Sequence, residues 1–215
     1  MEKNQLKISE IFHSIQGEST LVGLPTVFIR LTGCPLRCTW CDTEYAFAGG
    51  QWMEIDAIIE QVKEYGTPYV CVTGGEPMAQ KRCLVLLDKL IDNGFTVSLE
   101  TSGAISLVNV NDKVITIMDL KAPGSGEEQK NIYENINYLD AKDQIKFVIK
   151  DRVDYHWSQD IISRYNLIDK CEVLLSPVAD VLNPADLAQW ILDDKLLVRM
   201  QLQLHKILWN DAQGR

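Results

Sequence analysis

The chain alternates short apolar runs with segments whose apolar residues recur at helical spacing. The β-branched run TVFIRL at 26–31 lies between Pro25 and Gly33, which predicts a strand. Residues 52–65 repeat apolar side chains every three or four positions, which predicts a helix. By the same criteria we expect strands at 7–12, 26–31, 69–72, 95–99, 114–118, 145–149, 172–175 and 198–204, and helices at 52–65, 84–91, 127–139, 155–165 and 183–192.

This order of strands and helices predicts an α/β fold with a mainly parallel sheet. Polar residues follow several of the predicted strands, which is where parallel sheets and barrels carry their sites. A closed eight-stranded barrel needs about 250 residues, and this chain has 215. We therefore expect an incomplete TIM-type barrel that forms a single domain over residues 1–215.

Composition and charge narrow the range of partners. The net charge is −9, whereas nucleic-acid-binding surfaces are basic, so we expect no nucleic-acid partner. No apolar run reaches the roughly 18 residues of a membrane helix, and the N-terminal residues lack the apolar core of a secretory signal, so we expect no membrane partner. We expect a cytoplasmic protein, in which the six cysteines are metal ligands or free thiols rather than disulfides.

The strongest chemical signal is the sequence GCPLRCTWCDT at 33–43. Cys34, Cys38 and Cys41 follow a predicted strand with C-x3-C-x2-C spacing, so three thiolates of one loop can converge on a metal centre. A structural zinc site normally has four protein ligands. Three cysteines instead suit a four-iron four-sulfur cluster whose fourth iron stays open to a ligand. A zinc site and plain buried thiols remain the alternatives.

Further polar elements follow the next strands. In TGGEP at 73–77, two glycines allow a ligand to approach the backbone, and Glu76 can accept a hydrogen bond from an ammonium group. ETSG at 100–103 ends the following predicted strand, DLK at 119–121 ends the one after it, and Ser176 follows a later one. Solvated loops are the alternative for these segments, because loops are commonly polar.

The three-cysteine spacing together with TGGEP resembles the radical S-adenosylmethionine (SAM) superfamily. The resemblance implies a 4Fe–4S cluster on Cys34, Cys38 and Cys41, whose open iron binds SAM and whose reduction cleaves it to a 5′-deoxyadenosyl radical. It also implies a partial barrel and contacts to the cofactor from a set of residues around the cluster. These are Trp40, Gly74, Gly75, Glu76, Thr101, Ser102, Asp119, Leu120, Lys121 and Ser176.

A closer resemblance runs from about residue 8 to 45 and recurs at ETSG, DLKAPGSG and LQLHK. These segments are similar to the 7-carboxy-7-deazaguanine synthase family of queuosine biosynthesis. Its members convert 6-carboxy-5,6,7,8-tetrahydropterin to 7-carboxy-7-deazaguanine with loss of ammonia. The resemblance implies a lyase that uses Mg²⁺, forms a homodimer and takes its electron from a protein such as flavodoxin.

The same resemblance implies the residues that bind substrate and Mg²⁺. Arg30 suits the substrate carboxylate and Gln16 suits the pterin edge, because a guanidinium forks onto carboxylates and an amide both donates and accepts. Thr43 resembles the Mg²⁺ ligand, with Asp42 as the competing candidate. The expected substrate-binding residues are Ile15, Gln16, Gly17, Glu18, Arg30, Thr73, His205 and Arg215. A surface salt bridge of Arg30 and a turn cap by Thr43 are the alternatives.

Two other functions remain open at this point. A glycyl-radical activating enzyme would share the cluster and TGGEP but would act on a protein partner. A zinc-binding interaction module would need only the cysteines. The segment Gln16-Gly17-Glu18 and Arg30 favour the pterin-converting enzyme over both, and we expect His205 on the last strand, near the substrate.

Overall fold

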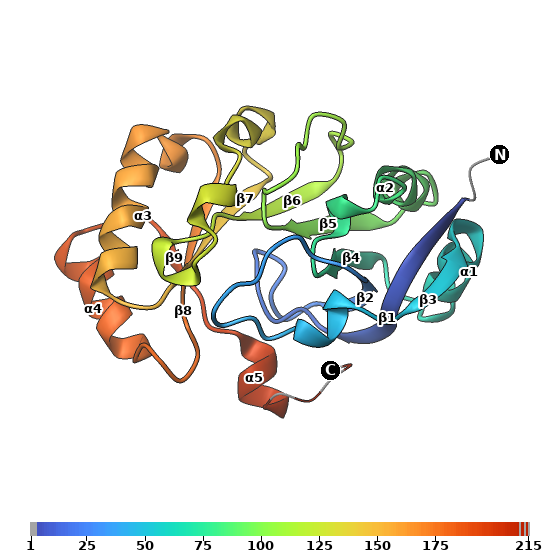
Figure 1. Ribbon diagram of the computed structural model, residues 1–215, viewed down its shortest axis with the longest axis horizontal. Coiled ribbons are helices and arrows are strands. Elements are labelled where there is room, and N and C mark those ends of the chain that lie inside the picture. Colours follow the sequence, from blue (N-terminus) through green and yellow to red (C-terminus); the bar gives the residue numbers. More distant parts are fainter. Residues whose placement is uncertain (1–3, 211, 213, 215) are drawn as a thin grey trace.

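The computed structural model describes residues 4–210, 212 and 214. The described residues form one sheet in the order β3-β1-β2-β4-β5-β6-β7-β8-β9, with helices around it (Figure 1). The strands are β1 (Gln5–Ile15), β2 (Pro25–Leu31), β3 (Gln51–Glu54), β4 (Tyr69–Gly74), β5 (Thr96–Thr101), β6 (Ile115–Asp119), β7 (Gln144–Ile149), β8 (Glu172–Pro177) and β9 (Arg199–Met200). The helices are α1 (Ile55–Glu64), α2 (Cys83–Asp92), α3 (Arg152–Arg164), α4 (Pro184–Asp193) and α5 (Leu204–Trp209).

The sheet is parallel from β2 to β9, while β1 runs antiparallel to both β2 and β3. The strands β3 and β9 stand at opposite ends of the strand order, so the sheet does not close on itself. This is the α/β, mainly parallel, incomplete barrel that the sequence predicts. The carboxyl ends of its parallel strands lie together at one rim, where the predicted site residues gather.

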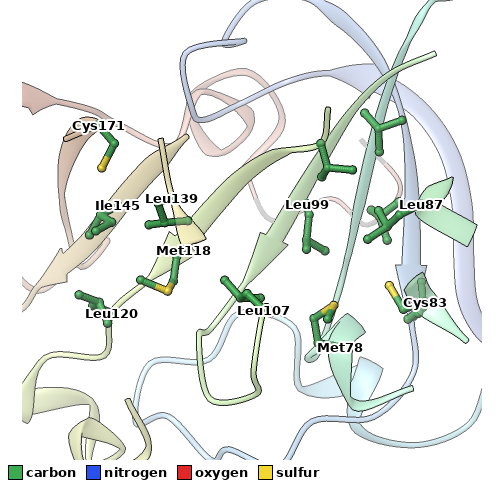
Figure 2. Close-up of a cluster of buried hydrophobic side chains, with 14 of the residues drawn as sticks. Met78, Cys83, Leu87, Leu99, Leu107, Met118, Leu120, Leu139, Ile145 and Cys171 are labelled. Carbon is green, nitrogen blue, oxygen red and sulfur yellow. The ribbon is translucent and has the colours of Figure 1, made fainter. Parts of the chain in front are cut away.

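Side chains along each strand alternate between the hydrophobic core and the inside of the partial barrel. On β7, Ile145, Phe147 and Ile149 are fully buried and belong to the hydrophobic core, whereas Lys146 and Val148 face the inside of the partial barrel. Figure 2 shows part of this core, to which the neighbouring strands β5, β6 and β7 contribute Leu99, Met118 and Ile145 among buried residues of other segments. The same strands therefore supply the apolar packing and line the interior.

Helix starts are fixed by local hydrogen bonds. The Asp151 side chain accepts from the amides of Val153 and Asp154 at the start of α3. The Asn183 side chain accepts from the amide of Ala185 at the start of α4, where Pro184 is the first helical residue. Both arrangements pair backbone N–H groups that a helix leaves without partners. The start of α4 is as the sequence predicts.

The prediction of a helix over 127–139 is wrong. This segment holds two short 3-10 turns, Glu128–Lys130 and Tyr133–Tyr138. The Asn131 side chain bonds to both backbone groups of Lys121, and Asn135 bonds to the backbone of Gly103, Ile105 and Leu107. These long-range bonds anchor the segment to other loops, which competes with a continuous helix.

Two further segments differ in their type of structure from the sequence prediction. Residues 51–54 form β3 before the helix starts at Ile55, because Trp52 and Met53 pair with β1. The last predicted strand shrinks to Arg199–Met200, and Leu204 begins α5. His205 therefore lies on a helix and not on a strand, since the Leu204 amide bonds to the Gly17 carbonyl instead of a neighbouring strand. Within the described residues, every helix is too short or too polar to cross a membrane.

Candidate active site

A cavity of about 530 Å³ opens inside the partial barrel. It brings together most of the residues that the sequence singles out. Those that line it are Ile15, Gln16, Gly17, Glu18, Arg30, Cys34, Cys38, Trp40, Cys41, Thr43, Thr73, Gly74, Gly75, Thr101, Ser102, Asp119, Lys121 and His205. Residues more than 180 positions apart in the chain thus line the same cavity.

The three cysteines of the loop after β2 face this cavity with free, half-buried thiols. Arg37 shapes the loop, because its guanidinium donates to the carbonyls of Cys34 and Leu36 at 2.8 and 2.6 Å. Burial raises the pKa of the Cys34 and Cys38 thiols. The other three cysteines are buried in the protein interior. Only the loop cysteines are therefore presented to a ligand in the cavity.

The donor set fits a cluster better than a single ion. Among the residues that the structure describes, no three His, Cys, Asp or Glu side chains are arranged to hold one metal ion. Three thiols spaced along the loop Cys34–Cys41 can instead reach different corners of a larger inorganic group. Thiolates are also the usual ligands of iron–sulfur clusters. The loop therefore suits a 4Fe–4S cluster.

The glycine turn after β4 packs directly against the cysteine loop. A Cβ on Gly75 would lie 2.5 Å from the Gly33 carbonyl oxygen and 2.7 Å from Cβ of Cys34. The Gly75 and Glu76 amides donate to the carbonyls of Leu31 and Gly33. Only a residue without a side chain fits here, so the turn and the cysteine loop hold a fixed position relative to each other.

Arg30 lies across from Glu10 in the β1–β2 pairing, and its Nε donates to Glu10 Oε1 at 2.7 Å. The Tyr45 hydroxyl donates to the same carboxylate oxygen at 2.8 Å. Burial lowers the pKa of Arg30, but the effects of Tyr45 and Glu10 outweigh it and raise that pKa. The guanidinium is a fixed positive charge in the cavity wall. The Arg30 side chain is 14% exposed and the Glu10 side chain 21%, so their ion pair is not the surface salt bridge considered as the alternative.

A second polar cluster joins three strands beside Arg30. The Gln16 amide donates to Glu100 Oε1 at 3.3 Å, and the Thr73 hydroxyl donates to Glu100 Oε2 at 3.1 Å. The Gln16 side-chain oxygen accepts from the amide of Glu18. These bonds fix the side chains of Gln16 and Thr73 toward the cavity.

The C-terminal segment closes one side of the site. The Leu204 amide bonds to the Gly17 carbonyl at 3.0 Å, and Gln203 donates to Glu18 Oε1 at 2.8 Å. His205 lines the cavity from the first turn of α5. Thr43 lines it from the cysteine loop, where its hydroxyl makes no capping bond and lies 3.9 Å from Cys41 Sγ. In this structure the Thr43 hydroxyl therefore does not cap the turn that follows it.

Comparison with known proteins agrees with this geometry. Residues 28–119 match the Radical SAM superfamily. The chain is 42% identical to 7-carboxy-7-deazaguanine synthase of Koribacter versatilis, over 95% of this chain and 97% of that protein. It is 43% identical to the protein of that name from Chlorobaculum tepidum, over 97% of each chain.

The chain belongs to the 7-carboxy-7-deazaguanine synthase family. It is a radical SAM enzyme, whose cofactors are a 4Fe–4S cluster and SAM. The fold is also similar to the crystal structure of QueE from Escherichia coli, with a TM-score of 0.77, 23% identity and coverage of 94% of this chain and 95% of that one. The SAM-bound SuiB of Streptococcus suis is a more distant structural neighbour, with a TM-score of 0.55 and 13% identity over 80% of this chain and 45% of that one.

Three of the described residues that we expected in the site do not line the cavity. Glu76 is fully buried, and its carboxylate accepts from Thr101, Ser102 and Met78. Leu120 and Ser176 are buried next to lining residues. Arg215 lies outside the described residues. Glu76 joins the loops after β4 and β5, and its contact with SAM stays a prediction.

The sequence analysis missed Lys146 and Glu10, and it named Glu100 only as part of the segment ETSG, without a role of its own. Lys146 donates to Glu18 Oε2 at 2.7 Å and stands 3.6 Å from Asp119 Oδ2, deep in the cavity. The available signal was a lysine in the middle of the apolar run QIKFVI at 144–149. A charged residue inside such a run is buried only when it has a partner. Glu10, in the alternating first strand, gave no comparable signal.

Proposed function

We propose that this chain converts 6-carboxy-5,6,7,8-tetrahydropterin to 7-carboxy-7-deazaguanine with loss of ammonia, a step of queuosine biosynthesis. The observation that carries the proposal is one cavity that combines a three-cysteine loop with a fixed guanidinium and an oriented amide. Relatives 42% and 43% identical carry the name of that synthase. An activating enzyme for a protein substrate would not need a small-molecule site of this kind.

Cys34, Cys38 and Cys41 would hold the 4Fe–4S cluster, since their thiols share the cavity and line one loop. When bound, the cluster and SAM supply the radical that abstracts a substrate hydrogen. The residues proposed for SAM are Trp40, Gly74, Gly75, Glu76, Thr101, Ser102, Asp119, Leu120, Lys121 and Ser176. Asp119 Oδ1 supports this, because it is buried and has no hydrogen-bond partner among the described residues. A buried acceptor without a partner favours a ligand donor such as a hydroxyl.

The substrate carboxylate would pair with Arg30, whose orientation Glu10 fixes. Gln16 would donate and accept along the pterin edge, and Thr73 and His205 would hold the ring from two sides of the cavity. Ile15, Gly17, Glu18 and Arg215 complete the proposed substrate set. Orientation matters here because a rearranging ring must stay aligned with the abstracting group.

Thr43 would ligate Mg²⁺, which prefers hard oxygen ligands and retains several waters. Its hydroxyl makes no capping bond to the turn that follows it. We further propose one radical SAM domain over 1–215, a homodimer, a flavodoxin-like electron donor and a cytoplasmic location. The six free cysteines suit a reducing compartment.

The decisive experiment is an anaerobic turnover assay. The reconstituted protein is incubated with the carboxypterin, SAM and a chemical reductant. The products are then separated and identified by mass spectrometry. We expect 7-carboxy-7-deazaguanine and ammonia. SAM cleavage without consumption of the pterin would overturn the proposed substrate. Iron–sulfur absorption that never forms would overturn the proposed cluster ligands.

A further inference from the structure

Lys146 is the cavity residue whose contacts reach furthest across the site. It lies in the middle of β7, between the core residues Ile145 and Phe147, and its side chain faces the interior. It pairs with Asp119 in the β6–β7 register, and its side chain is 14% exposed. One nitrogen thus lies 2.7 Å from Glu18 Oε2 and 3.6 Å from Asp119 Oδ2.

The charges around this ammonium form an alternating row. Lys121 donates to Asp119 Oδ2 at 3.0 Å on one side, and Gln203 donates to Glu18 Oε1 at 2.8 Å on the other. Two ammonium groups and two carboxylates make the row neutral. Buried charges are tolerated in such an arrangement because each has an opposite charge and further hydrogen bonds.

The two carboxylates belong to different halves of the cavity. Glu18 follows Gln16, which contacts Glu100 beside Arg30. Asp119 ends β6, and its Oδ1 is buried without a hydrogen-bond partner in the part of the chain that the structure describes. Among the described residues, Lys146 forms ion pairs with Glu18 and Asp119 and none with Arg30 or the cysteines, so it stands between the two halves.

We propose that Lys146 is a positioning residue, which holds the Glu18 carboxylate for the substrate and the Asp119 carboxylate for SAM. This role rests on the function proposed above. With Lys146 hydrogen-bonded to one oxygen of Glu18 and ion-paired at 3.6 Å with one oxygen of Asp119, the remaining oxygens keep fixed directions. Loss of the ammonium would leave Glu18 with Gln203 and would leave Asp119 with Lys121, so both carboxylates would turn away from their present positions.

Electrostatics gives this role a signature in pH. The charged and titratable groups near Glu18 and Lys146 are Glu100 on β5, Asp119 at the end of β6, Lys121 after β6, His205 on α5 and Asp42 in the cysteine loop. Burial raises the pKa of Glu18, but the charge and hydrogen bond of Lys146 outweigh it and lower that pKa to about 2. Without Lys146, burial would act against a smaller opposing charge, and the pKa of Glu18 would rise.

The test compares Lys146→Met with Lys146→Arg and a matched control. Lys150→Met removes the exposed lysine just beyond the end of β7, outside the cavity. Carboxypterin and SAM are each titrated into the reconstituted, cluster-loaded protein, without turnover, between about pH 5 and pH 8. Unfolding temperatures show whether each variant is folded.

We expect Lys146→Met to bind the carboxypterin about tenfold to a hundredfold more weakly, since a charge-assisted contact is lost. Its affinity should also fall as the pH is lowered, because Glu18 takes up a proton. SAM affinity should fall less. Lys146→Arg should keep the flat pH profile of the parent, and Lys150→Met should match the parent throughout. A merely structural role would lower the unfolding temperature and leave the pH profile flat.

Unchanged affinities with a flat pH profile in folded Lys146→Met would overturn the proposal. If that variant does not fold, Lys146→Gln replaces it, because its amide can still donate to Glu18 while its charge is absent. The same weaker, pH-dependent binding is expected, and parental binding would overturn the proposal. If the parent itself does not bind the carboxypterin, the proposed function fails instead. SAM affinity then decides the role of Lys146. Lys146→Met must weaken the binding of SAM, and Lys150→Met must leave it unchanged.

Discussion

Gly17 and His205 lie so close together that a Cβ on Gly17 would overlap the imidazole Nδ1 of His205. The backbone nitrogen of His205 would lie 3.1 Å from that Cβ. Gly17→Ala should therefore displace α5 or rotate the imidazole, and we expect the KM for the carboxypterin to rise about tenfold or more, since small misplacements are costly. In a His205→Ala background the same substitution should cost much less. Equal losses in both backgrounds would contradict this explanation.

The loop cysteines give a second prediction. Cys34→Ala, Cys38→Ala and Cys41→Ala should each lose the cluster, because a remaining pair of thiolates leaves two irons without protein ligands. Cys171→Ala is the matched control, since this thiol is buried outside the cavity. Iron content and visible absorption after anaerobic reconstitution measure the result. A Cys171 variant as poor in iron as the Cys38 variant would show that the ligands are misassigned.

Arg30 gives a third prediction. Arg30→Ala should weaken carboxypterin binding about tenfold to a hundredfold, which corresponds to the loss of a charge-assisted contact. SAM binding should change much less. Glu10→Gln keeps the guanidinium but weakens its anchor at 2.7 Å, so we expect an intermediate loss. Titration of both ligands into both variants provides the measurement, and carboxypterin affinity equal to that of the parent would remove Arg30 from the site.

The metal dependence of turnover tests Thr43. Thr43→Val removes the hydroxyl while keeping the shape of the side chain. We expect this variant to keep its cluster and its SAM affinity but to lose the stimulation of turnover by Mg²⁺, because a neutral hard oxygen ligand is gone. Thr39→Val is the control, since that hydroxyl bonds to the Gly124 carbonyl instead. Parental Mg²⁺ stimulation in Thr43→Val would exclude Thr43 as the ligand.

The free energy of unfolding at acid pH should depend on the ion pair between Glu18 and Lys146. The pKa of Glu18 is lowered from 4.5 to about 2 in the folded chain, so the unfolded chain binds more protons between these values. The stabilisation is complete above pH 4.5 and disappears as the pH falls toward 2; it amounts to about 3 kcal/mol at most. Unfolding free energies of the parent should thus fall more steeply between about pH 5 and pH 3 than those of Glu18→Gln. The exposed Glu60→Gln serves as control, and parallel curves for parent and Glu18→Gln would contradict the pair's role.

Local pattern was enough to predict most of the sheet. Runs such as 26–31 and 145–149 are apolar and β-branched, and their neighbours in space are other strands of the same kind. The failures arose where distant partners decided the outcome. Asn131 and Asn135 bond to loops elsewhere, and Trp52 pairs with Lys7. Helical periodicity carries no information on such bonds.

The candidate site was predicted as far as its residues stand in recognisable motifs. The cysteine loop and the glycine turn have fixed spacings, so Cys34 and Gly75 could be named from the sequence. Lys146 and Glu10 stand alone in strands, and their importance depends on partners that folding brings close. Glu76 was expected to face a ligand, yet its carboxylate is taken up by neighbouring loops. Whether a side chain faces a ligand or a loop is a property of packing.

The alternating faces of β7 bear on how such a chain can change over time. Phe147 and Ile149 stabilise the sheet, whereas Val148 between them borders the cavity. An inward-facing exchange such as Val148→Thr alters the polarity next to a bound molecule without touching either core neighbour. Successive substitutions of this kind can redirect the chain toward new substrates while every intermediate sequence still folds. Scaffold conservation and chemical diversification are therefore compatible within a single strand.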